Sequence, residues 1–268
     1  MRNRRSDLLL FFGGTFAVSW IPWAVALLLG GDTTQGSTRV LFVVGTFGPS
    51  LVAGILWALR RRGAPRTNPL RTVHRWLLPA LVLGAAPFVV AALIEGSHDP
   101  AAAQRLVESM GGPLGFVALF LVAGPLAEEF GWRGYAQPRL RRTLSPIATA
   151  GLLGSAWALW HVPLFLLGGT SQARLGLFSW QALLFFLTLV PLSYTAWFVS
   201  ERLAGGVAAA VALHFAGNAA VSLLPSLSVQ ATLIAFCVTS TIAIVLSGMT
   251  RSQSRTRLPA DVEVERAA

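Results

Sequence analysis

Two neighbouring carboxylates and an arginine lie at the end of a long apolar run. The segment PLAEEFGWRG, residues 125–134, follows LGFVALFLVAG with no polar linker between them. A charge near the centre of a bilayer costs about 2.5 to 3.5 kcal/mol on insertion scales, so ionisable residues within apolar spans usually mark a functional site. We therefore take Glu128, Glu129 and Arg133 as the first part of a candidate site.

Helical spacing assigns these three residues different surroundings. Residues four apart on a helix share a face, whereas adjacent residues are turned by about 100°. Glu129 and Arg133 are four apart, so we expect an ion pair within one helix. Glu128 is then left without a cation on its own helix. A carboxylate that is not held in an ion pair can take up and release a proton. We therefore interpret Glu128 as a general base.

Two later segments carry further polar side chains at the same spacing. His214 and Asn218 are four apart, and both can donate hydrogen bonds. Two such donors aimed at a developing oxyanion would supply the stabilisation that acyl transfer needs. Trp157 and His161 repeat the spacing. Because Pro163 lacks the N–H of a regular helix, we expect a kink beside His161.

The composition places these residues in a membrane protein. Of the 268 residues, 54% are hydrophobic and 12% charged, and the mean hydropathy is +0.63. A spanning helix needs about 20 mostly apolar residues. The sequence therefore predicts an all-α bundle over residues 1–248, with a motif-bearing core at about 110–225, and a polar cytoplasmic tail over 249–268 that is typical of disorder. The expected spans are residues 8–29, 39–59, 76–95, 113–134, 146–168, 179–200, 204–224 and 227–247.

The basic residues indicate the orientation of this bundle. All 21 are arginines, and with the N-terminus inside, 18 of them fall on the cytoplasmic side. The positive-inside rule thus favours a multi-pass protein of the cell membrane with both termini cytoplasmic. The net charge of +10 suggests anionic lipid headgroups as partners, since arginines beside spans do not resemble a nucleic-acid surface. The single Cys237 excludes an internal disulfide.

The depth of the polar residues indicates where the fourth span ends. If that span stopped at Gly134, Glu128 would lie about 9 Å inside the cytoplasmic edge, whereas His161 would lie about 23 Å inside it. The two side chains could not meet. We therefore expect the helix to continue through YAQPRLRR, residues 135–142, despite Pro138. Arg133 then lies in the bundle, and the 17 arginines that remain on the cytoplasmic side favour the same orientation.

These positions resemble the motifs of the CPBP family, which includes type II CAAX prenyl endopeptidases and bacterial Abi-type bacteriocin-processing proteins. The EExxxR motif corresponds to residues 128–133, followed by Gly134. The aromatic-xxx-His motif corresponds to Trp157 and His161, and HxxxN to His214 and Asn218. Trp157 stands where phenylalanine is more usual, and either ring could form a wall of the site.

The resemblance implies an intramembrane glutamic protease. In that scheme Glu128 and His161 activate water, and His214 and Asn218 form the oxyanion hole. Glu129, with Arg133, organises the site. The scheme requires no metal or other cofactor. Its substrate would be a membrane-associated or lipidated peptide or protein.

Two alternatives remain open at this point. In the first, Glu128, His161 and His214 are ligands of a zinc ion that holds a water molecule, as their residue types permit. No HExxH spacing supports this alternative. In the second, the chain is a non-enzymatic immunity, scaffold or transport-linked membrane protein, in which the polar motif residues only hold the helices together. Such a structural role would not need a pair of oxyanion-hole donors.

Overall fold

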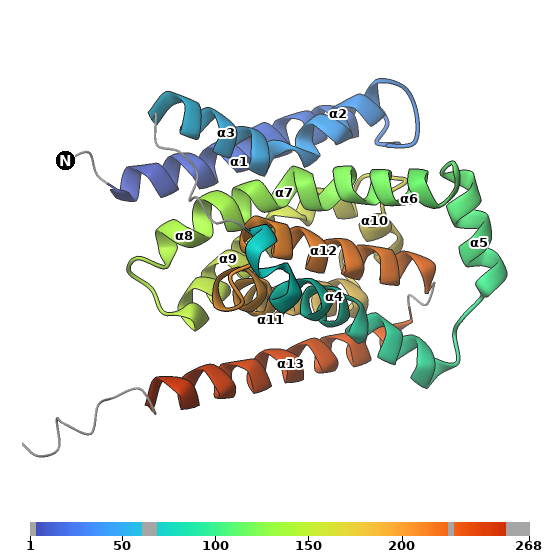
Figure 1. Cartoon of the computed structure of the whole chain (residues 1–268). Helices are drawn as coiled ribbons and strands as arrows, with labels where there is room; N and C mark the ends of the chain where they lie inside the picture. Colours follow the sequence, from blue (N-terminus) through green and yellow to red (C-terminus); the bar gives the residue numbers. More distant parts are fainter. Residues whose placement is uncertain (1–3, 61–68, 225–227, 256–268) are drawn as a thin grey trace, which may run out of the picture.

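The protein is a bundle of helices. The computed structural model describes residues 4–60, 69–224 and 228–255. Within these ranges the chain is helical apart from loops and one isolated β-bridge between Asp32 and Gly168, which confirms the expected fold class. Most long helices run along a common direction, and α1 (Arg4–Leu28) begins at the end of the bundle where α13 (Val229–Arg255) finishes (Figure 1).

The described part of the chain contains thirteen α-helices and five 3₁₀ or π-helical segments, joined by loops. The remaining α-helices are α2 (Gly36–Thr46), α3 (Gly48–Arg60), α4 (Val73–Glu95), α5 (Pro100–Ser109), α6 (Gly112–Leu121), α7 (Ala127–Glu129), α8 (Gln137–Leu140), α9 (Pro146–Trp160), α10 (Ser171–Leu175), α11 (Trp180–Trp197) and α12 (Gly206–Leu223). The turns are the 3₁₀ segments η1 (Pro69–Thr72) and η4 (Val162–Phe165), and the π-helical segments η2 (Val122–Leu126), η3 (Phe130–Ala136) and η5 (Phe198–Arg202).

The helices agree with the expected membrane spans. Seven helical segments in the described ranges are long and apolar enough to cross a membrane, and α2 with α3 forms an eighth if this bent pair counts as one span. The pair is bent by 52°. The bend lies at Phe47, just before Gly48 and Pro49. Proline favours the first turn of a new helix because it lacks the N–H that a continuing helix would need. The expected second span is thus a broken one.

The fourth span extends beyond Gly134, as the depth argument required. A continuous helical segment runs over Gly112–Leu140 and comprises α6, η2, α7, η3 and α8. Glu128 and Glu129 belong to the short α-helical turn between two π-helical segments. Such wide turns occur often at functional sites. Pro125 lies in the first of them, and its missing N–H removes one regular helical bond.

The fifth span differs from the expectation of a kinked helix. The α-helix ends at Trp160, and η4 continues as a tighter 3₁₀ turn. The N–H of His161 donates to Ala158 O at 3.1 Å, three residues back. Because Pro163 has no N–H to extend the α pattern, the helix ends where we expected it only to bend. His161 consequently caps α9.

Aromatic packing holds the fourth and fifth spans together. Trp132 of η3 meets Trp160 of α9 edge-on at 6.2 Å between ring centroids, and both rings are fully buried. Phe11 of α1 stacks on Tyr135 at 5.1 Å. A Cβ at Gly131 would lie 2.5 Å from the backbone of Pro49, so this glycine allows the close approach of α3 to η3. The segment carrying Glu128 and Arg133 is thereby fixed between neighbouring spans.

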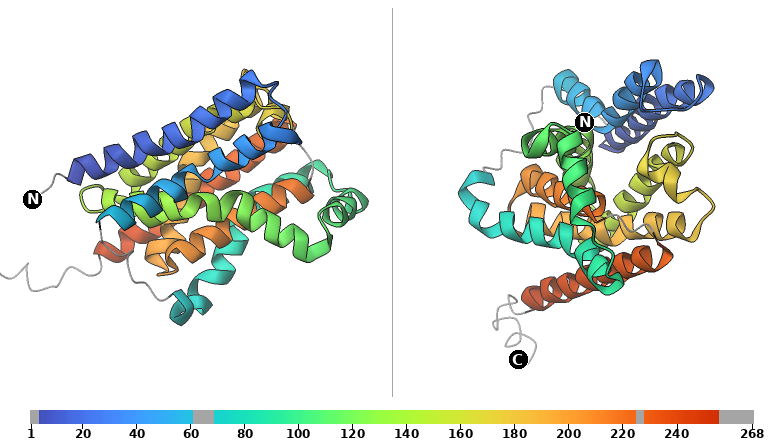
Figure 2. Two further views of the ribbon diagram at one scale, coloured as in Figure 1. Left: turned by 90° about the horizontal axis from the view of Figure 1, so that it is seen from above. Right: turned by 90° about the vertical axis from the view of Figure 1, so that its right-hand side faces the viewer.

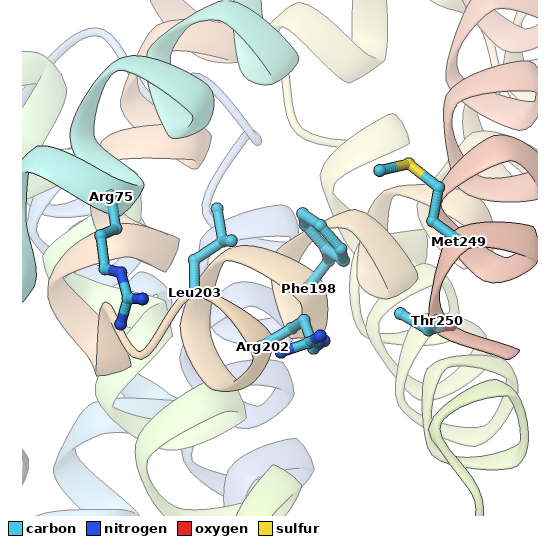
Figure 3. A pocket seen from close by; sticks show the side chains of 6 residues that line it. All are labelled: Arg75, Phe198, Arg202, Leu203, Met249 and Thr250. Carbon is cyan, nitrogen blue, oxygen red and sulfur yellow. The ribbon is translucent and has the colours of Figure 1, made fainter. Parts of the chain in front are cut away.

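Two further features lie at the end of the bundle where α1 begins and α13 finishes. α13 continues to Arg255, past residue 249 where we expected the polar tail to begin; residues 256–268 lie outside the described ranges. A cavity of about 260 Å³ opens beside the ends of α4, η5 and α13 (Figure 3). Its lining contains none of the motif residues and consists of Arg75, Phe198, Arg202, Leu203, Met249 and Thr250.

Candidate active site

Three helices bring the motif residues together in the interior of the bundle. Glu128 and Glu129 come from α7, Trp157 and His161 from the end of α9, and His214 with Asn218 from α12. α12 lies beside the helical segment that contains α7 (Figures 1 and 2), and Trp157 reaches from α9 to Glu128 and His214. The charged and imidazole side chains are buried, and Asn218 is half-buried. Burying such groups is costly unless they are paired, so their partners define the site.

Glu129 is the centre of the polar cluster. Its Oε1 accepts from Arg133 Nη1 at 2.9 Å, and both side chains are 1% exposed, which confirms the expected ion pair. The same oxygen lies 2.8 Å from Nδ1 of His214. When the carboxyl is ionised it can only accept, so Nδ1 is the donor. Glu129 therefore links its own helix to α12, a connection that helical spacing did not predict.

Arg133 reaches two further helices from its place in η3. Its Nη2 donates to Ser193 Oγ at 3.2 Å, and its guanidinium lies 4.4 Å from the centroid of the Trp157 ring. The second contact is a cation–π interaction. Sequence reasoning missed Ser193. The available signal was a hydroxyl within the apolar helix α11, which is too common to distinguish this residue from others.

Glu128 has a different environment from its neighbour. Its Oε2 accepts a hydrogen bond from Trp157 Nε1 at 2.6 Å. None of the ion pairs among the described residues includes Glu128, in agreement with the expectation that it has no cation on its own helix. Trp157 is therefore more than the expected wall of the site, because its indole also donates to Glu128.

His161 is fixed by the end of its own helix. Its Nδ1 lies 2.7 Å from Trp157 O. A carbonyl only accepts, so Nδ1 carries the proton and Nε2 of the neutral ring is an acceptor. Trp157 O is available because the N–H of His161 bonds to Ala158 instead. No hydrogen bond in the described ranges joins His161 to Glu128; Trp157 contacts both.

One point beside η2 is surrounded by three chemically active atoms. A Cβ built on Gly124 would lie 3.0 Å from Asn218 Nδ2, 3.7 Å from His214 Nε2 and 4.0 Å from Glu128 Oε1. Because this residue is a glycine, no Cβ crowds the three atoms. Gly124 was not among the residues predicted from the sequence. A glycine one helical turn before Glu128 was the available signal.

The residues proposed as zinc ligands do not form a recognisable metal centre. Throughout the described residues, no group of three or more His, Cys, Asp or Glu side chains is arranged to hold a metal ion. Glu128 and His161 instead both bond to Trp157, through its indole N–H and its backbone carbonyl respectively, and His214 bonds to Glu129. The arrangement of these side chains thus offers no support for the zinc alternative.

Two comparisons with known proteins find similarity to CAAX proteases. A family model described as type II CAAX prenyl endopeptidase Rce1-like matches residues 110–220, and this range contains every motif residue. A CAAX prenyl protease 2 from Methanococcus maripaludis is 24% identical over 221 residues, which cover 78% of this chain and 82% of the relative. The non-enzymatic alternative loses its basis. With the three motifs assembled in one buried cluster, these similarities support the CAAX protease (CPBP) family, and the chain is a multi-pass membrane peptidase.

Proposed function

We propose that this peptidase is an intramembrane glutamic endopeptidase that hydrolyses a peptide bond in a membrane-associated or lipidated peptide or protein. The observation that carries this proposal is the convergence of Glu128 Oε1, His214 Nε2 and Asn218 Nδ2 beside Gly124. A base and two polar nitrogens gathered at one place match what peptide hydrolysis requires. The relative's printed name concerns prenylated CAAX substrates, so a prenylated peptide is the first class to test.

Glu128 and His161 act on the attacking water. Glu128 takes a proton from it, the resulting hydroxide attacks the carbonyl carbon, and the proton passes to the leaving amine when the C–N bond breaks. The Oε2 of Glu128 is engaged by Trp157, which leaves Oε1 for the water. The Nδ1 of His161 is engaged by a backbone carbonyl, so its Nε2 is the nitrogen that accepts from the water.

His214 and Asn218 stabilise the tetrahedral oxyanion. The side-chain amide of Asn218 donates through Nδ2. His214 donates through Nε2 only in its doubly protonated form, because the proton on Nδ1 is already directed at Glu129. Glu129 is the counter-ion of that form, and Arg133 holds Glu129 in place. Losing one such donor typically reduces turnover about 100- to 1000-fold.

The orientation and the lipid partners belong to the same proposal. α1 begins and α13 ends at one end of the bundle (Figure 1), as an even number of membrane crossings requires. We assign that end to the cytoplasm on the basis of the arginine distribution. Arg75 and Arg202 line the cavity there (Figure 3), and anionic lipid headgroups are their expected partners.

A cleavage assay with purified protein tests the function. The substrates are two peptides of one sequence with a C-terminal CAAX motif, one farnesylated and one not. Glu128→Gln and His161→Ala should abolish cleavage, whereas Glu108→Gln, a change on the exposed surface of α5, should not. Membrane proteomics of cells carrying wild type or Glu128→Gln would then identify the natural substrate. Turnover at the wild-type rate by Glu128→Gln contradicts the mechanism.

A strong chelator in the same assay separates the proposed mechanism from the zinc alternative. We expect cleavage to continue at an unchanged rate in the chelator. Loss of cleavage that zinc restores would instead assign Glu128, His161 and His214 to a metal.

A further inference from the structure

The indole of Trp157 connects the fifth span to the proposed base. Trp157 is 2% exposed, and its Nε1 lies 2.6 Å from Glu128 Oε2. This length is at the short end for an N–H donor, as expected when the acceptor is a charged carboxylate. Because α9 and α7 belong to different spans, the bond exists only in the assembled bundle.

The bond makes the two oxygens of Glu128 inequivalent. Oε2 is occupied by the indole N–H, while Oε1 is the oxygen near His214 Nε2 and Asn218 Nδ2. The last torsion of a glutamate is broad, so a free carboxylate samples many orientations. Among the hydrogen bonds of the described residues, the Trp157 bond is the one that involves the Glu128 side chain. It selects which oxygen faces the reacting atoms.

Neighbouring residues hold the indole in turn. The Arg133 guanidinium lies over its face at 4.4 Å from the ring centroid, and the His214 ring meets it edge-on at 5.3 Å and 72°. A cation over the ring polarises the indole so that its N–H becomes a stronger donor. The ring that orients Glu128 is thus fixed by residues of the same cluster.

We propose that Trp157 is a positioning residue, whose indole N–H orients the Glu128 carboxylate so that Oε1 faces the water and the scissile carbonyl. The inference rests on the proposed function. It differs from a packing role, because packing needs the ring whereas positioning needs the N–H. Replacing the N–H while keeping the ring therefore separates the two roles.

Two replacements at this position provide that separation. Trp157→Phe keeps an aromatic ring without the donor. The analogue β-(3-benzothienyl)alanine, introduced at position 157, keeps the shape of the indole and has sulfur in place of the N–H. Trp23→Phe is the matched control: Trp23 is fully buried and its Nε1 donates to Phe42 O at 3.0 Å, outside the site.

Kinetics with the peptide substrate give the first readout. We expect kcat to fall about 10- to 100-fold in both position-157 variants, the size of effect that a misplaced catalytic group produces. KM should stay close to wild type, because the indole bonds to Glu128 and not to the peptide. Trp23→Phe should keep the wild-type kcat. A wild-type kcat in the benzothienyl variant would overturn the proposal.

The second readout does not depend on activity. In ¹H–¹⁵N spectra of protein labelled at the indole nitrogens of its nine tryptophans, the signal missing from Trp157→Phe belongs to Trp157. Glu128→Ala should shift that signal upfield, and Glu108→Ala should leave it in place. An unmoved signal in Glu128→Ala would overturn the positioning role while leaving the proposed function intact. Wild-type cleavage by Glu128→Gln would overturn both.

Discussion

The pair formed by Glu129 and Arg133 offers a quantitative test of how the site is held together. Both side chains are 1% exposed, and their N–O distance is 2.9 Å. Removing one partner of a buried pair leaves an uncompensated charge, at a cost of about 3 to 5 kcal/mol. Arg133→Met keeps most of the side-chain volume, so little of its cost comes from a cavity. His214 still bonds to Glu129, and we therefore expect a loss near the lower value, about 3 kcal/mol.

The double variant makes the test specific. Glu129→Leu combined with Arg133→Met removes both charges, and a buried pair replaced by apolar residues of similar size is often neutral in stability. Here the double change also leaves Nδ1 of His214 without its acceptor, at a cost of about 1 to 3 kcal/mol. The double variant should thus lose much less stability than the two single variants added together.

Reversible unfolding in mixed detergent micelles measures these differences. Arg142→Met, an exposed cation just beyond α8, should stay within about 0.5 kcal/mol of wild type. Two outcomes would refute the reasoning. One is a free energy of unfolding for Arg133→Met that equals wild type, and the other is a double variant whose loss equals the sum of the single losses.

Three further changes test the site and the orientation. Gly124→Ala would place a methyl group 3.0 Å from Asn218 Nδ2 and beside Glu128 Oε1, so cleavage should be lost while Gly54→Ala, whose Cβ meets nothing within 4 Å, stays active; normal cleavage by Gly124→Ala would show that the reaction does not use this space. Asn218→Ala should reduce kcat about 100- to 1000-fold with little change in peptide binding, and an unchanged kcat would remove Asn218 from the oxyanion hole. Topology reporters fused after Leu29 and after Met249 should respectively read outside and inside, and the reverse pattern would invert the orientation.

Much of the architecture could be predicted from the sequence because it depends on local properties. The length of each apolar run sets the possible spans, and the runs that contain Phe116, Leu189 and Leu246 all form membrane-length helices. The pair of Glu129 and Arg133 follows from helical periodicity. Even the extension of the fourth span to Leu140 followed from the rise per residue, since Glu128 had to reach the depth of His161.

Local rules were weaker where backbone geometry is irregular. Pro163 indicated a disturbance beside His161, yet whether a helix bends or ends there depends on the packing around it, and α9 ends at Trp160. The run over residues 39–59 has the length of one span, but the break at Phe47 divides it into α2 and α3.

Only the tertiary structure decided how the motifs meet. The bonds from Trp157 to Glu128 and from His214 to Glu129 each join two spans, and no spacing along one helix encodes the rotation and offset of another. The convergence of polar atoms beside Gly124 has the same origin, since Glu128 approaches this glycine from the fourth span and Asn218 from α12. The sequence by itself determined the spans, the candidate residues and one ion pair, because these arise within single helices. The register between neighbouring helices determined which side chains bond to each other across the bundle, and close packing of side chains sets that register.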